Sequence, residues 1–188
     1  SFGCGNGTRG LLTQGFNSSY AYTTAIDYVT IASAGNGTDY GDLTVARGSG
    51  SGSFNSTTRG GFVGGNTNGV AFTNTIDYVT IASTGNATDF GDTLAALNGA
   101  AGCSNSTRAI IASGDISGSA QQNVIQYFTI ASTGNATDFG DLTGGGRYGA
   151  AGCSSTRALI AADFVGNSSG IDYITIASTG NGTDFGDL

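Results

Sequence analysis

The chain has 188 residues, a formal net charge of −7, and only 10% charged residues, which are Asp and Arg alone. Phosphate binding needs clustered Lys and Arg, so six dispersed Arg side chains argue against a nucleic-acid partner. A run of about 18 apolar residues is absent, which argues against a membrane-spanning segment. The sequence begins at Ser1 without an initiator Met or a signal peptide, which indicates a removed leader or a segment of a longer polypeptide.

One phrase of the sequence is repeated four times. It begins at Ile26, Ile76, Ile125 and Ile171, at spacings of 50, 49 and 46 residues. A Thr-Arg pair precedes every copy, with the Arg residues at Arg9, Arg59, Arg108 and Arg157. Such a period indicates one supersecondary unit copied in tandem. We therefore expect a single repeat domain over residues 1–188, with units of approximately 1–48, 49–97, 98–146 and 147–188.

The first unit predicts its strands in chain order. Residues 9–13 open into Leu11 and Leu12 and predict the first strand. Residues 14–25 differ between copies in length and composition, as surface loops do. Residues 26–32 predict a strand with two apolar faces, Ile26 and Tyr28 on one and Val29 and Ile31 on the other. Residues 34–37 predict a hairpin turn and residues 38–44 a further strand, and we expect a fourth, short strand within residues 45–54.

Three or four antiparallel strands in each unit of 46–50 residues predict an all-β fold. A strand that is apolar on both faces lies between layers, which favours a β-propeller of four blades. Both termini fall in the same connection of the unit, as ring closure would require. Four blades are also compatible with part of a larger ring or fibre, and a β-solenoid is the alternative architecture.

The second unit carries a resemblance to a known family. A Gly-rich strand at residues 60–65, a loop, and then Ile76-Asp77-Tyr78-Val79 resemble kelch-type propeller repeats, although the kelch Trp is missing. The phrase at residues 76–92 is similar to tandem repeats in predicted structural proteins, of the virion or tail-fibre type, from aquatic bacteriophages. The resemblance implies kelch-like blades and a location on a virion or outside the cell.

The four Arg residues before the repeated phrases are predicted to form ion pairs. Few other charges are available, and buried charges need partners. The repeated Asp residues supply carboxylates that Arg can bind with two hydrogen bonds. Each Arg is predicted to pair with an Asp of its own or the next unit, and the first candidate set is Asp27, Asp77 and Asp172. Gln126 replaces Asp in the third copy of that set, so the preferred partners of Arg9, Arg59, Arg108 and Arg157 are Asp42, Asp92, Asp141 and Asp187.

Cys4, Cys103 and Cys153 occupy one equivalent position, which Phe54 fills in the second unit. Replacement by Phe favours a buried apolar role, with a disulfide or a metal site as alternatives. We predict no metal site and no cofactor, because His and the CxxC spacing of zinc sites are absent. Calcium is the weaker alternative, through oxygens of Asn86, Thr88, Asp89 and Asp92, whereas Asx hydrogen bonds that cap the turn explain these residues better.

Nine Asn-x-Ser/Thr sequences are potential N-glycan acceptors if the protein is a eukaryotic secreted product. Four of them are copies of one repeated turn, so copying explains much of the excess. The acceptor positions are Asn6, Asn17, Asn36, Asn55, Asn86, Asn105, Asn135, Asn167 and Asn181.

The residues indicate a non-enzymatic structural protein. The chain lacks His, Glu and Lys, and no serine lies in a nucleophile elbow. We expect a building block of a virion appendage or extracellular fibre that self-associates into a homo-oligomer or filament. The alternative is an adhesion module that binds a cell-surface glycan or receptor through its variable loops. The candidate binding residues of those loops are Tyr20, Tyr22, Phe72, Asp115 and Asp163.

Overall fold

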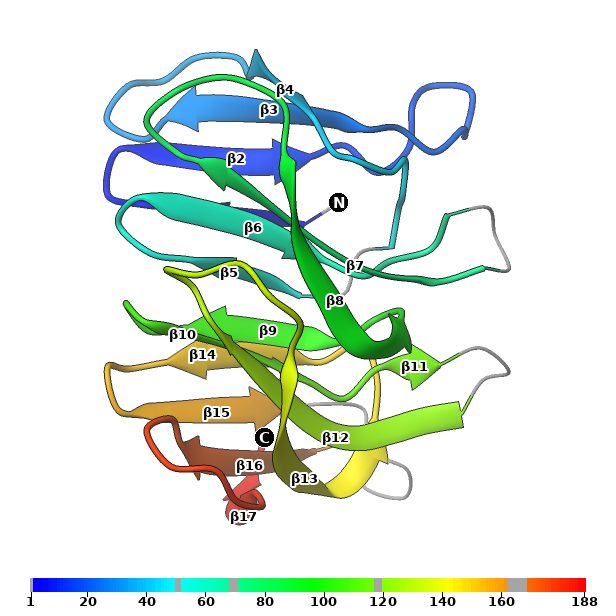
Figure 1. Ribbon diagram of the computed structural model, residues 1–188, viewed down its shortest axis with the longest axis vertical. Coiled ribbons are helices and arrows are strands. Elements are labelled where there is room, and N and C mark those ends of the chain that lie inside the picture. The colour runs from blue at the N-terminus through cyan, green and yellow to red at the C-terminus, as the bar shows by residue number, and fades with distance from the viewer. Residues whose placement is uncertain (1, 50–51, 68–70, 117–119, 162–168) are drawn as a thin grey trace.

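The computed structural model describes residues 2–49, 52–67, 71–116, 120–161 and 169–188, and within these residues the protein is all β (Figure 1). The seventeen described strands form four antiparallel sheets, one from each repeat unit. Pairings between these strands join neighbours within a unit. In a β-solenoid, strands of successive coils would pair with each other, so the structure does not have that architecture.

The first two sheets have the same strand order. The first contains β1 (Gly3–Gly5), β2 (Arg9–Thr13), β3 (Ala25–Thr30) and β4 (Thr38–Asp42). The second contains β5 (Ser53–Asn55), β6 (Arg59–Val63), β7 (Thr73–Thr80) and β8 (Thr88–Leu97).

The third sheet adds one short strand to this plan. It contains β9 (Ala101–Ser104), β10 (Arg108–Ala112), β11 (Asp115–Ile116), β12 (Ala120–Thr129) and β13 (Thr137–Gly146). The fourth returns to four strands, β14 (Ala150–Cys153), β15 (Arg157–Ala161), β16 (Gly170–Thr175) and β17 (Thr183–Asp187). The predicted short strand between units is therefore the first strand of each following sheet.

Each sheet contains a β-bulge opposite the start of its repeated phrase. In the first sheet Ile26 pairs with Gly41 and Asp27 pairs with Asp39, so Tyr40 is the extra residue. Gly41 has φ = 145°, a backbone conformation that side chains with a Cβ rarely adopt. The Asp-Phe-Gly sequence of the later units is therefore the bulge of the outer strand.

The two faces of each sheet have different neighbours. We call the face with Leu11, Ile26 and Tyr40 the forward face, because it packs against the following sheet. The opposite, rear face contains Leu12, Val29 and Ile31 in the first sheet. In the second, third and fourth sheets, the equivalent residues pack against the preceding sheet. Three hydrophobic clusters fill the three junctions between consecutive sheets. This arrangement confirms the prediction of a strand with two apolar faces.

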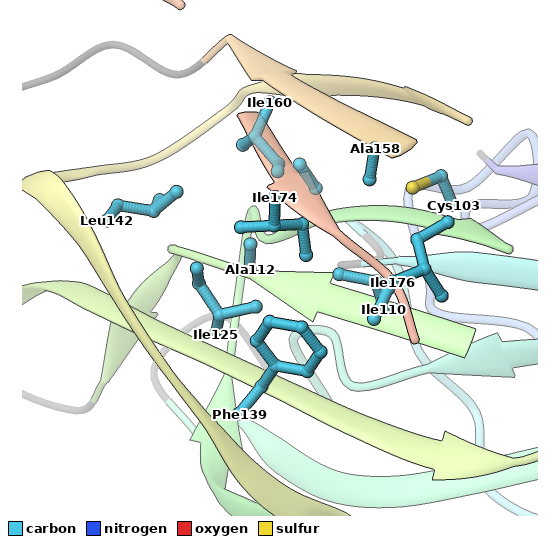
Figure 2. Close-up of a cluster of buried hydrophobic side chains, with 11 residues drawn as sticks. Cys103, Ile110, Ala112, Ile125, Phe139, Leu142, Ala158, Ile160, Ile174 and Ile176 are labelled. Atoms are coloured by element: carbon cyan, nitrogen blue, oxygen red, sulfur yellow. The ribbon is translucent and has the colours of Figure 1, made fainter. Parts of the chain in front are cut away.

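Figure 2 shows the cluster between the third and fourth sheets. Ile110, Ile125 and Phe139 come from the forward face of the third sheet, and Ile160 and Ile174 come from the rear face of the fourth. All five side chains are almost fully buried. At about 25 cal/mol for each Å² of apolar surface removed from water, burial of this kind dominates the stability of a junction.

The sheets follow one another in sequence order. Figure 1 shows the first sheet at one end of the long axis and the fourth at the other. The short first strands β1, β5, β9 and β14 contact one another in succession. Among the described residues, no hydrophobic cluster joins the fourth sheet to the first. The ring closure that the positions of the termini predict is therefore not seen in a single chain.

Candidate functional site

The predicted aromatic binding residues lie in the segments between the second and third strands of the first two sheets. Tyr20 is 88% exposed and has φ = 59° in the loop between β2 and β3. Tyr22 is half-buried, and its ring lies 4.7 Å from that of Phe16. Phe72 is also half-buried and forms an isolated bridge with Asn66. Tyr20 alone of the three predicted side chains is fully available for stacking on a ligand.

Of the two predicted acidic loop residues, Asp115 lies among the described residues. Asp115 is buried and accepts a hydrogen bond at 3.0 Å from the guanidinium of Arg147, so its carboxylate is not exposed on the loop surface. The ion pair joins β11 to the segment that follows β13. Asp163 lies outside the described residues.

The four anchor Arg residues do not form the predicted ion pairs. Each guanidinium lies over the ring of a Tyr on its own sheet, at 4.4–4.7 Å from the ring centroid. Arg9, Arg59 and Arg108 donate from Nη1 to a backbone carbonyl of the next sheet, that of Ile81, Ile130 and Ile176 respectively. All four Arg side chains stack on a Tyr ring, and Arg9, Arg59 and Arg108 also have a carbonyl acceptor. Among the described residues, no ion pair joins the four Arg residues to Asp42, Asp92, Asp141 or Asp187.

Sequence reasoning missed the buried ion pair of the first junction. Arg47 Nη2 lies 2.9 Å from Asp77 Oδ2, and both side chains have zero exposure. Thr44 donates to the same carboxylate from its backbone N–H and its hydroxyl. Burial lowers the pKa of Arg47, and the negative charge of Asp77 opposes that effect. The sequence does contain a signal for this pair. The positions equivalent to Arg47 and Asp77 in the next junction are Leu97 and Gln126, so both charges are lost together.

The repeated turn joins each sheet to the one before it. In the first junction, the N–H groups of Gly85 and Ala87 donate to the carbonyls of Tyr40 and Asp42. Asn86 Oδ1 accepts from the backbone N–H of Asp42 at 3.1 Å. The other junctions repeat the Asn contact, with Asn135 on Asp92 and Asn181 on Asp141.

This docked turn accounts for the residues of the calcium alternative. Asn86 holds the preceding strand, and Asp89 accepts from the N–H of Gly91, as an Asx turn does. Among the described residues, His, Cys, Asp and Glu form no group of three that could hold a metal ion. The side-chain oxygens of Asn86 and Asp89 therefore accept hydrogen bonds from backbone N–H groups.

The potential glycan acceptors occupy several environments. Asn6 and Asn105 donate from Nδ2, the atom that would carry a glycan, to carbonyls of Thr57 and Ser155 in the next unit. Asn17 accepts from backbone N–H groups of its own loop. Asn36 lies in the exposed turn of the first sheet, Asn55 is half-buried in β5, and Asn167 lies outside the described residues.

All three cysteines lie in or against the hydrophobic clusters, as the apolar role predicts, and two of them also form the alternative disulfide. Cys103 and Cys153 form a disulfide between the third and fourth sheets, with their Cα atoms 5.9 Å apart. Cys4 carries a free thiol, and burial raises its pKa to about 12. Its neighbour in the array is Phe54, which cannot form a disulfide, so the pairing follows from the order of the sheets.

The outer faces of the two end sheets are apolar and uncovered. Ile31 on the rear face of the first sheet is 58% exposed, whereas its equivalent Ile81 has zero exposure. Phe185 on the forward face of the fourth sheet is 53% exposed, whereas Phe139 is 3% exposed. Leu12 is also exposed on the rear face of the first sheet, and Leu159 on the forward face of the fourth. These two faces are the strongest candidate for an interaction site, since exposed apolar patches mark binding surfaces.

No protein-family model matches the chain, and no curated protein matches it. The described residues contain no helix with the length and apolar composition needed to cross a bilayer.

Proposed function

We propose that the protein is a non-enzymatic structural repeat protein, a rigid building block of an extracellular fibre or virion appendage. The observation that carries this proposal is that one junction is built three times. In each, the same positions supply the apolar cluster, the Arg contact to a carbonyl and the docked turn. The repeated Arg residues and the repeated turn, which are the polar groups that a catalytic or metal site could have used, therefore serve to join the sheets.

We further propose that the four sheets are kelch-like blades of a propeller segment or fibre, as the resemblance to phage repeats implies. Contact between successive first strands supports this, because the first strands of propeller blades surround a common axis. The disulfide supports an extracellular location, since such bonds persist in oxidising compartments.

Negative-stain electron microscopy of the purified chain tests the structural function. The expected result is regular filaments or rings at high protein concentration. Particles that stay separate single chains at every concentration would contradict the proposal.

The second candidate function is adhesion through the variable loops, and the exposure of Tyr20 favours it. Exposed aromatic rings stack on sugars and other planar or apolar ligand surfaces. A glycan array probed with the wild-type chain and the Tyr20→Ala variant tests this function. Retention that the substitution abolishes would support adhesion, and absence of retention would exclude glycan binding.

A further inference from the structure

We propose that the forward face of the fourth sheet binds the rear face of the first sheet in a second copy of this chain, and so forms a fourth junction of the internal kind. The inference rests on the proposed structural function and specifies its contact. The two faces differ, so each copy offers one of each. Such a head-to-tail contact produces a ring if the rotation closes and a filament if it does not.

The apolar side chains of the two faces are the two halves of the internal clusters. In the cluster of Figure 2, Ile110 and Phe139 of the third sheet pack with Ile160 and Ile176 of the fourth. The positions equivalent to the first two are Leu159 and Phe185, and those equivalent to the last two are Leu12 and Ile31. The four equivalent side chains are all apolar, and all four are exposed in the single chain.

Arg157 is oriented as its equivalents are. Its guanidinium lies 4.4 Å from the centroid of the Tyr173 ring, as Arg108 lies 4.6 Å from that of Tyr127. Arg108 also donates at 2.7 Å to the carbonyl of Ile176 in the next sheet. The equivalent acceptor for Arg157 is the carbonyl of Ile31 in the second copy. Stacking on Tyr173 already fixes the side chain, which lowers the entropy cost of forming that hydrogen bond.

The docked turn also has its counterpart. A Cβ atom at Gly91 or Gly140 would meet the backbone of the following turn, at Gly134 or Gly180. Gly186 has the same kind of positive φ, and open space surrounds the corresponding position. The turn of residues 34–37 in a second copy fits this space. This turn is fully exposed in the single chain.

The buried acid of the internal junctions does not oppose the contact. Asp77 and Asp172 need Thr donors from the preceding sheet. Their equivalent Asp27 accepts at 2.8 Å from Gln14 Nε2 within its own unit. A hydrogen-bonded carboxylate costs less to cover than an isolated one, so the rear face of the first sheet can be buried without a new donor.

Two single-face variants test the junction. Leu12→Asp with Ile31→Asp places charge on the rear face of the first sheet. Leu159→Asp with Phe185→Asp places charge on the forward face of the fourth. All four positions are exposed, so both variants should fold, and far-UV circular dichroism checks this. Leu94→Asp is the matched control, because Leu94 is an exposed apolar residue away from both end faces.

Sedimentation velocity measures the outcome. We expect the wild type and Leu94→Asp to assemble, each single-face variant to stay monomeric at 18.6 kDa, and their equimolar mixture to form a species of twice that mass. The mixture contains one intact face of each kind, so a single heterodimeric junction is its only product.

Three results would overturn the inference. A single-face variant that dimerises alone would show that like faces associate. A variant with both faces charged that assembles as well as the wild type would contradict this junction and leave the structural function intact. A wild type that stays monomeric at every concentration would remove both proposals.

Discussion

The two interior sheets and the two end sheets have nearly the same sequence phrases but different environments. Ile81 and Phe90 of the second sheet are buried between neighbours, while Ile31 of the first sheet and Phe185 of the fourth face solvent. The comparison shows that the stabilising contribution of a repeated residue is set by the neighbouring sheet. Nearest-neighbour junctions of this kind are what stabilise repeat proteins. A substitution at an interior position should therefore cost more in the monomer than the same substitution at the equivalent position of an end sheet.

The largest difference is expected at the repeated acid. Asp77→Ala removes the partner of a fully buried Arg47, which should lower the free energy of unfolding by about 3–5 kcal/mol. Asp27→Ala changes a half-buried group and should cost about 0.5 kcal/mol. Urea titration followed by circular dichroism measures both values.

A double variant controls this experiment. Arg47→Leu with Asp77→Gln copies Leu97 and Gln126 of the next junction and should recover most of the loss. Equal costs for Asp77→Ala and Asp27→Ala would show that the ion pair does not stabilise the junction.

The repeated Ile gives the next largest difference. Ile81→Ala leaves a cavity at a site with zero exposure and should cost about 3 kcal/mol. Ile31→Ala should cost about 0.5 kcal/mol in the monomer, since Ile31 is exposed there. Thermal and urea denaturation measure the pair. If the proposed assembly forms, the cost of Ile31→Ala in assembled protein should rise toward the interior value.

Substitution of the bulge glycine by Ala can distinguish the cost of backbone strain from the cost of contact with the turn of the next sheet. Gly91→Ala adds a Cβ at φ = 144°, about 2.5 Å from the backbone of Gly134, and should cost about 2–3 kcal/mol. Gly186→Ala brings a similar φ but no contact, and should cost about 1 kcal/mol. The difference in unfolding free energy then measures the close approach of the turn. Equal costs would assign the effect to strain alone.

The anchor Arg should give the smallest difference. Arg108→Ala removes a stacking contact and a hydrogen bond to the fourth sheet, which together are worth about 1–2 kcal/mol. Arg157→Ala removes the stacking contact and should cost about 0.5 kcal/mol. Melting temperatures of the two variants give the comparison. An unchanged melting temperature for Arg108→Ala would exclude a structural role for the carbonyl contact.

Much of the fold follows from local pattern. Alternation of apolar residues in the repeated phrase predicts β3, β7, β12 and β16, and the turn chemistry at residues 34–37 predicts the hairpin that follows. Both are properties of neighbours in sequence. The partners of Arg9 were not predicted, because its carbonyl acceptor belongs to Ile81 of another sheet. Sequence reasoning counts charges and has no measure of which backbone carbonyls lie nearby.

The cysteine pairing shows the same limit. Three equivalent cysteines are symmetric in the sequence, and Phe54 marks a position without a thiol. The third and fourth sheets bring the Cα atoms of Cys103 and Cys153 to 5.9 Å, whereas the sheet that follows Cys4 carries Phe54 at the equivalent position. The distance between sheets, which decides this pairing, is a property of side-chain packing in the junction.

The sequence by itself determined that each unit is a set of short strands with two apolar faces, because β-strand alternation is written in residues that are close in the chain. The tertiary structure decided which of these faces are covered. Each unit carries both faces wherever it stands, and burial depends on whether another sheet lies against them. The exposed rear face at Ile31 and the exposed forward face at Phe185 are therefore consequences of position in the array.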